Sequence, residues 1–203
     1  MTGVQTCALP ISASELQVRP SPLAQVQAIT YFARALGAAR SGNTDAAKAD
    51  IAKLAELRDR LRDAKDAYWS EQVDIQRQVA TAWVLYAEGK QDDALNAMSA
   101  AADAEDKTEK HPVTPGVPKP ARELYGVMLL ESGNAKEALA AFEATLKKEP
   151  NRLGAYAGAA KAAEKSGEST KAQEYYRKVV AIADAADDGR TEVADARTYL
   201  TKR

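Results

Sequence analysis

A self-similarity with a period of 34 residues constrains this chain more than any other feature. Three residues of one segment recur in the next segment as the pairs Gly133 and Gly167, Ala138 and Ala172, and Phe142 and Tyr176. A repeated unit of this size cannot bury its apolar face alone, so neighbouring copies must stack to form a continuous core. The sequence therefore predicts an array of small, similar helical units.

The spacing inside each copy adds detail. A small residue precedes each turn glycine by seven positions, at Gly126 and again at Ala160, and Pro150 closes the first copy, because proline cannot continue a helix. This pattern resembles the tetratricopeptide repeat, a pair of antiparallel helices that approach closely at the small residue. The second copy has Asp184 in place of the proline, so we expect its second helix to run on.

Two weaker copies lie upstream, with turn glycines at Gly42 and Gly89. The resemblance therefore implies an all-α fold, an α-solenoid of antiparallel helix pairs. The repeat pattern has one position for a small residue, one for an alanine and one for a bulky residue. These positions are filled by Ala35, Ala47 and Ile51 in one upstream copy and by Ala82, Ala94 and Met98 in the other. The periodicity predicts about nine helices, over residues 22–40, 44–66, 67–88, 91–105, 120–132, 135–148, 151–166, 169–186 and 190–201.

The chain is expected to divide into five parts. Residues 13–105 form two long, divergent hairpins, 106–119 a proline-rich linker, 120–186 two standard repeats, and 187–203 a C-terminal capping helix. The upstream hairpins are longer than a standard repeat because the helix over 44–66 carries a long apolar stripe. We expect Thr44 or Asp45 to cap that helix, since a short oxygen side chain satisfies free amide donors.

Residues 1–12 need a separate interpretation. They carry no charge, no helical period and the only cysteine of the chain, Cys7. The stretch resembles the translation of a sequencing-library adapter, so we expect it to be non-native and the true N-terminus to lie upstream. Without Cys7, no disulfide or cysteine-based metal site is expected.

Composition argues against several classes of function. The 28 basic and 29 acidic residues give a net charge of -1, which is unlike the unopposed basic face of a nucleic-acid binder. No apolar run is long enough to span a bilayer. A single histidine and no glycine-rich phosphate loop predict no metal site, no cofactor and no catalytic residues. His111 in the linker is a candidate polar contact or metal ligand presented by a rigid loop or, alternatively, a residue that caps or packs against the preceding helix.

The resemblance also implies a binding groove along the first helices of the repeats. Its positions correspond to Phe32, Leu36, Val79, Trp83, Tyr86, Glu123, Val127, Leu130, Lys161 and Glu164. Members of the family that bind chaperones hold a peptide's terminal carboxylate with a lysine, asparagine and arginine clamp, and that clamp is absent here. Among the apolar members of the set, Phe32, Leu36 and Trp83 fit an apolar groove or, alternatively, simple core packing.

Two hypotheses of function follow. The first is a non-catalytic scaffold that binds a protein or peptide, with no nucleic acid and no transmembrane segment involved. The second is an accessory repeat region of a larger protein whose missing N-terminal part carries an enzymatic or membrane-anchoring function. The linker around His111 resembles bacterial tetratricopeptide proteins of poorly defined function, which are often exported, and so favours a periplasmic or exported protein over a cytoplasmic one.

Overall fold

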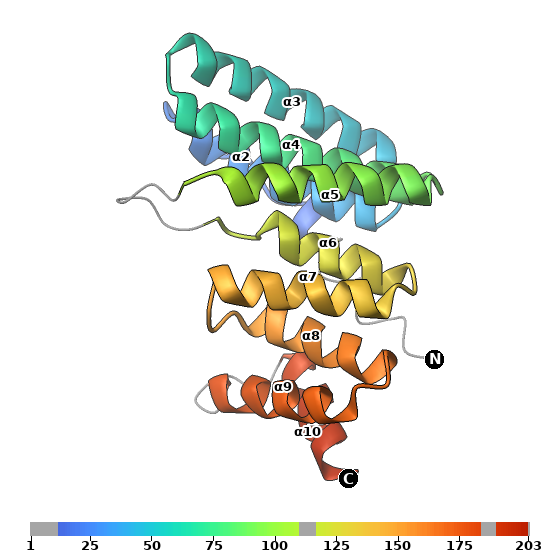
Figure 1. Ribbon diagram of the computed structural model, residues 1–203. Helices are drawn as coiled ribbons and strands as arrows, with labels where there is room; N and C mark the ends of the chain where they lie inside the picture. Colours follow the sequence, from blue (N-terminus) through green and yellow to red (C-terminus); the bar gives the residue numbers. More distant parts are fainter. Residues whose placement is uncertain (1–11, 110–116, 184–189, 203) are drawn as a thin grey trace. The chain divides into compact units, whose positions relative to one another are not determined.

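The computed structural model describes residues 12–109, 117–183 and 190–202, and the regular structure within these ranges is entirely helical (Figure 1). This confirms the predicted fold class, and the helix ends differ from the predicted ones by a few residues only. The helices are α2 (Ala24–Arg40), α3 (Thr44–Asp63), α4 (Ala67–Ala87), α5 (Gln91–Lys107), α6 (Ala121–Glu131), α7 (Ala135–Lys148), α8 (Leu153–Lys165), α9 (Ser169–Ile182) and α10 (Thr191–Thr201).

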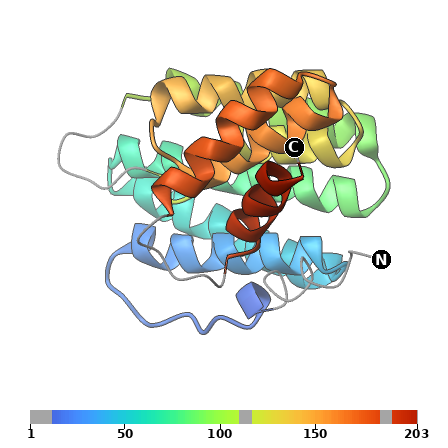
Figure 2. The ribbon, with the colours of Figure 1, turned by 90° about the horizontal axis from the view of Figure 1, so that it is seen from below.

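The chain divides into two compact units, residues 1–117 and residues 118–203. In the first unit each helix packs against the next from α2 to α5, and α2 also contacts α4. In the second unit the same holds from α6 to α10, and α8 contacts both α6 and α10 (Figures 1 and 2). Each unit is thus built from antiparallel helix pairs in which first helices lie beside first helices. The boundary between Val117 and Pro118 falls within the segment predicted as a linker.

One turn closes all four helix hairpins. Gly133 has φ +85°, a left-handed conformation that side chains with a Cβ rarely adopt, and the next amide, Asn134 N, donates to Leu129 O over 2.9 Å. The same turn occurs, with φ between +78° and +85°, at Gly42, Gly89 and Gly167. Because the turns are alike, the extra length of the upstream hairpins lies in their helices. Helices α3 and α4 have 20 and 21 residues, against 14 and 13 in α7 and α8.

Two details of the helix ends differ from prediction. The cap of α3 is Asn43, whose side chain accepts from Ala46 N, and not Thr44 or Asp45. The position before the helix is set by the glycine turn, which places Asn43 where its oxygen reaches the free amides. Helix α9 also does not run on beyond the length of α7. It ends at Ile182, where the amide of Ala183 is shared between two carbonyls and tightens the last turn.

The core of the second unit is made of small residues around a few large ones. Helix α8 buries alanines on nearly every side, at Ala155, Ala157, Ala159, Ala160, Ala162 and Ala163. The fully buried ring of Phe142 fits against the backbones of Gly126 and Gly158, which lie on the two flanking first helices. Close approach of three helices at one ring is therefore possible because two of them present no side chain there.

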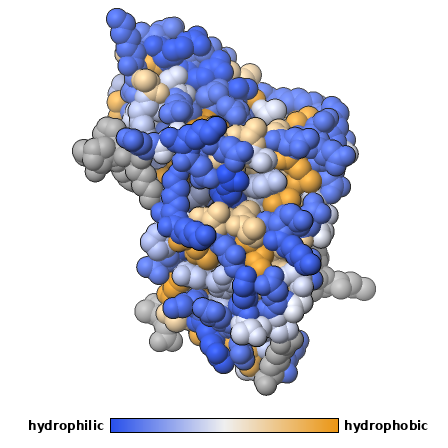
Figure 3. Space-filling view, viewed as in Figure 1, coloured by the Kyte–Doolittle hydropathy of each residue, from blue (hydrophilic) through white to orange (hydrophobic). Residues whose placement is uncertain are grey.

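The outer surfaces follow the charge pattern of the sequence. On the face shown in Figure 3, α3 presents mainly hydrophilic side chains, in keeping with the many charges among its 20 residues. At the C-terminal end, α10 buries Val193 and Ala196 against its neighbours, and Tyr199 packs on Tyr176 with ring centroids 4.4 Å apart. Among the described residues, no helix is long and apolar enough to cross a membrane.

Candidate first-helix face

Residues at the same repeat position come together along the first helices of the second unit. Val127 on α6, Lys161 on α8 and Asp195 on α10 follow one another at the 34-residue spacing of the repeat. Lys161 Nζ and Asp195 Oδ2 are 2.8 Å apart, so equivalent positions on α8 and α10 are direct neighbours. A second row one turn along has Leu130 and Glu164. We call these five residues the first-helix face.

The first-helix face combines apolar and charged groups that solvent can reach. Val127 and Leu130 are half-buried, and Glu164 is exposed. The Lys161 and Asp195 side chains are 41% and 51% exposed, so their ion pair is hydrated and can exchange partners at little cost. Such a surface can pack against an apolar side chain and pair with a charged one at the same time.

A hydrogen bond from a buried tyrosine positions the Glu164 side chain. The hydroxyl of buried Tyr176 donates to Glu164 Oε2 over 2.7 Å. Burial and the hydrogen bond to this carboxylate both raise the pKa of Tyr176, so its hydroxyl stays protonated and remains a donor. The carboxylate of Glu164 therefore has a fixed position while one side of it faces solvent.

Glu123, the charged groove position of α6, is buried. Its residue is 1% exposed, and its carboxylate accepts from Lys119 Nζ at 2.5 Å and from Arg152 Nε at 2.7 Å. Arg152 Nη2 also donates to Pro118 O, which ties the start of α6 to the start of α8. A Cβ on Gly154 would lie 2.5 Å from Glu123 Oε1, so this glycine provides the space for the carboxylate. The cluster joins two helix starts and leaves little of Glu123 for a ligand to touch.

The groove positions predicted in residues 1–117 are mostly interior. Phe32, Val79 and Trp83 are 5%, 1% and 2% exposed, whereas Leu36 and Tyr86 are half-buried. Trp83 packs edge-on against Tyr86, with ring centroids 5.5 Å apart, and the Arg40 guanidinium lies 4.3 Å from the Trp83 ring centroid.

The ten predicted groove positions fall into two sets, five in each unit. His111 lies outside the described residues. Sequence reasoning missed Asp195, although the 34-residue spacing from Val127 and Lys161 points to it. It also missed Lys119, Arg40 and Arg152, and no repeat spacing identifies these three.

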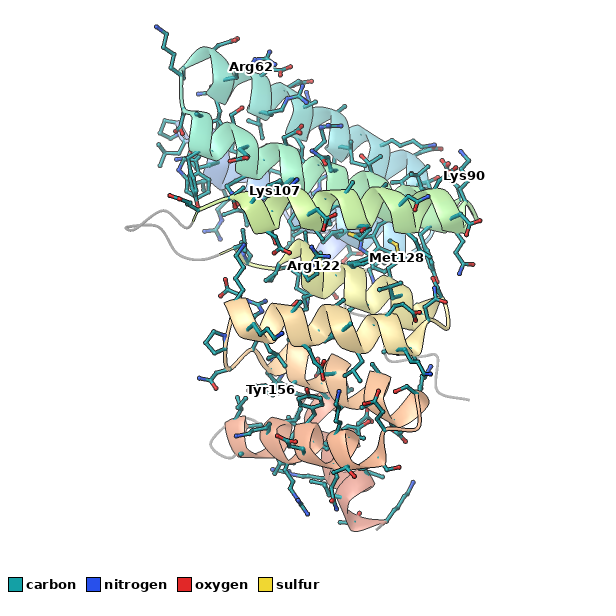
Figure 4. The ribbon with its side chains drawn as sticks, viewed as in Figure 1. Arg62, Lys90, Lys107, Arg122, Met128 and Tyr156 are labelled. Carbon is teal, nitrogen blue, oxygen red and sulfur yellow. The ribbon has the colours of Figure 1, made fainter. Side chains whose placement is uncertain are left out.

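A cluster of polar side chains joins the second helices of the same unit. Glu143 on α7 accepts from Lys171 Nζ at 3.0 Å and from the Tyr175 hydroxyl at 2.8 Å, both on α9. Burial alone would raise the pKa of Glu143, but these two donors outweigh it and lower the pKa. Tyr156 lies where α8 meets α9, and its ring centroid is 6.1 Å from that of Tyr175 (Figure 4). The cluster links three helices.

Within the described ranges, no group of three or more His, Cys, Asp or Glu side chains is arranged to hold a metal ion. Comparison with family models matches residues 129–197 to a model described as Tetratricopeptide repeat. Comparisons with curated proteins and with solved structures give no significant match. The match covers most of the second unit, in which the repeat spacing, the glycine turns and the stacked first helices were described above. Residues 129–197 are therefore a tetratricopeptide repeat segment, as their sequence pattern predicted.

Proposed function

We propose that this chain is a non-catalytic scaffold that binds a protein or peptide on the first-helix face. The observation that carries the proposal is the row of equivalent residues Val127, Lys161 and Asp195 on α6, α8 and α10. Lys161 and Asp195 form an ion pair. Stacked repeats present such a row as one continuous surface, and repeat arrays generally use that surface for binding. Apolar contacts supply most of the affinity of such a surface, while charged groups supply specificity.

The chemistry of the face indicates the kind of segment it accepts. An apolar side chain would pack on Val127 and Leu130, and an acidic side chain would compete with Asp195 for Lys161. The residues that hold a terminal carboxylate in chaperone-binding relatives are missing, so the partner is expected to contribute an internal segment. The scaffold needs no cofactor and, with no unopposed basic face in the sequence, is not expected to bind nucleic acid. In residues 1–117, Leu36 and Tyr86 stay candidate contacts.

A peptide selection tests this proposal. The full chain is immobilised, a library of displayed peptides is selected on it, and the enriched peptides are titrated by calorimetry. Lys161→Glu and Leu130→Ser are each expected to weaken binding about tenfold, because each removes one type of contact from the face. Lys178→Glu is the matched control, since it makes the same charge change at an exposed position of α9.

Two results would contradict the proposal. One is a selection that enriches no peptide with saturable binding. The other is an enriched peptide that binds the Lys161→Glu, Leu130→Ser and Lys178→Glu proteins equally well, which would place its site elsewhere.

The alternative is that these repeats are an accessory region of a larger protein. It is supported by the resemblance of residues 1–12 to a translated sequencing adapter. Long-read sequencing of the source locus decides between the two. A reading frame that continues upstream in place of residues 1–12 supports the accessory role, and its new residues would reveal an enzymatic or membrane-anchoring part. Genomic codons for residues 1–12, preceded by a stop codon, would eliminate this alternative.

A further inference from the structure

Exposed large apolar side chains are concentrated in one short stretch of the first unit. Of the five that occur among the described residues, four lie between positions 16 and 29, and the fifth, Ile182, lies on α9. Leu23, Val26 and Ile29 are 53%, 47% and 40% exposed. Their spacing of three residues places them along one side of α2 and its cap, because helical residues three apart share a face. Leu16, 44% exposed, belongs to the segment just before α2.

The opposite side of α2 is already occupied. Ala28, Phe32 and Ala35 are buried on it, and the helix packs against α3 and α4. Helix α2 is therefore apolar on both its inner and its outer side. An exposed apolar stripe on the outer side of a helix has the character of a contact surface.

A cavity adjoins this stripe. It has a volume of about 530 Å³ and lies between α2 and the segment before it, lined by Val18, Pro20, Ser21, Pro22, Gln27 and Tyr31. Gln27 Nε2 donates to Ser21 O over 2.6 Å and fixes the segment on α2. Figure 2 shows this segment running beside α2. None of the six lining residues is charged, and Val18, Pro20 and Pro22 form an apolar part of the lining on which an apolar side chain can pack.

The rim of this surface is basic. Helix α2 contains no Asp or Glu, and its two charged residues are Arg34 and Arg40. Arg19 is exposed in the preceding segment, and Arg60 of α3 reaches the same segment, where it donates to Pro22 O over 3.1 Å. Most acidic groups nearby are paired: Asp50 with Arg34, Glu56 with Lys53, and Asp59 with Arg58 and Arg62. Glu15 and Asp63 are exposed.

We propose that the α2 surface, defined as Leu16, Leu23, Val26, Ile29 and the adjoining cavity, binds an amphipathic helix of another protein whose apolar stripe is flanked by acidic residues. The apolar stripe would cover the outer side of α2 and place one large side chain in the cavity. The acidic flanks would lie near Arg19 and Arg60. This site is separate from the first-helix face and does not depend on its function.

The test uses the full chain and synthetic peptides as long as α2. One peptide has leucines at helical i, i+3 and i+4 spacing with glutamates at the flanking positions. A second has lysines in place of the glutamates, and a third has the composition of the first in scrambled order. Saturable binding of the first peptide is expected by calorimetry, with the lysine peptide and the scrambled peptide at least about tenfold weaker.

Variants of the chain locate the site. Val26→Ser combined with Ile29→Ser is expected to weaken binding of the glutamate peptide about tenfold, and the fold should survive because both side chains are nearly half exposed. Ile182→Ser removes an exposed apolar side chain of the second unit and should leave binding unchanged. Circular dichroism melting of each variant verifies that it is folded.

Three outcomes would overturn the proposal. The first is no saturable binding of the glutamate peptide, and the second is equal binding of the lysine or scrambled peptide. The third is a wild-type dimer in sedimentation velocity that is absent only in the variant with both Val26→Ser and Ile29→Ser. This result would assign the α2 surface to a second copy of the chain. Loss of binding of the library-selected peptides in the Lys161→Glu variant would concern the first-helix face only. Failure of one site is therefore distinguishable from failure of the other.

Discussion

A methyl group on Gly158 would lie 2.4 Å from the ring of Phe142. The two residues face each other across α8 and α7, and the ring is fully buried between them and Gly126. At Gly126 the same methyl group would lie 3.0 Å from the ring. This contact is tight, but a small shift of the ring would relieve it. The aromatic residue of this repeat thus depends on two glycines, of which Gly158 is the more constrained.

Substitution of Gly158 by alanine is expected to destabilise the second unit. Alanine is favoured over glycine inside a helix by about 1 kcal/mol, but overpacking against a buried ring costs about 1–3 kcal/mol and rigid neighbours give the higher end. The expected net loss is about 1–2 kcal/mol in the free energy of unfolding. Urea unfolding followed by circular dichroism measures it, and hydrogen exchange should show faster exchange in α7 and α8.

Gly126→Ala is the matched control for that substitution. Its closest contact is longer, so the helix propensity of alanine offsets more of the cost and the loss should be smaller than at Gly158. A Gly158→Ala protein as stable as the wild type, or a larger loss at Gly126, would contradict the geometry described here.

Glu123→Gln is expected to cost about 1–3 kcal/mol of stability. The substitution preserves size but removes the charge that accepts from Lys119 and Arg152, and it turns one acceptor into a donor that faces them. Breaking a fully buried ion pair costs more, but here the two cations are 40% and 26% exposed and stay hydrated. Chemical denaturation of the full chain measures the loss.

Asp195→Asn is the control for the buried cluster. It also breaks an ion pair, with Lys161, but both side chains are about half exposed, so the expected loss is at most about 0.5 kcal/mol. Equal losses for the two substitutions would mean that the buried position of Glu123 makes no difference.

The helical order could be predicted from the sequence because its signals are local. Each hairpin carries its own turn glycine, and Gly42, Gly89, Gly133 and Gly167 all adopt the left-handed conformation that the pattern requires. The cap of α3 was predicted wrongly, at Thr44 or Asp45 instead of Asn43, because the glycine turn sets where the helix begins. Signals of this kind locate a helix well and its first residue less well.

The candidate site could be predicted only in part, because burial depends on neighbours that the repeat pattern does not specify. Glu123 and Glu164 hold charged groove positions in successive repeats, yet one is buried and the other exposed. The difference comes from Arg152 and Gly154 at the start of α8, which supply a charge and a space for Glu123. Trp83 is likewise buried in spite of its groove position, and the Arg40 guanidinium over its ring comes from a different helix.

Tyr176→Phe is expected to cost about 0.5–1.5 kcal/mol. It deletes the hydroxyl that donates to Glu164 without opening a large cavity, and Phe142 occupies the equivalent position of the preceding repeat. Because Glu164 is exposed, water replaces the lost donor and keeps the cost in this range. Thermal unfolding by calorimetry measures the change, and a loss well above this range would show that the hydroxyl has a further role.

Glu88 is expected to titrate far below its ordinary pKa. Its carboxylate accepts from Lys48 Nζ at 2.7 Å and from Lys90 Nζ at 2.8 Å, and these hydrogen bonds lower its pKa from 4.5 to about 2. The folded state therefore binds this proton less readily than the unfolded state. The stability that Glu88 contributes is full above pH 4.5 and is lost as the pH falls from 4.5 towards 2.

Carboxyl NMR titration of the wild type and unfolding of Glu88→Gln together check this expectation. Unfolding of the first unit is followed by tryptophan fluorescence, since Trp69 and Trp83, the only two tryptophans of the chain, both lie in it. The wild type should be more stable than Glu88→Gln near neutral pH, and the difference should vanish as the pH approaches 2. Because the lysines are exposed, molar sodium chloride should move the Glu88 pKa back towards 4.5. A pKa near 4.5 already at low salt would mean that the two lysines do not hold the carboxylate in solution.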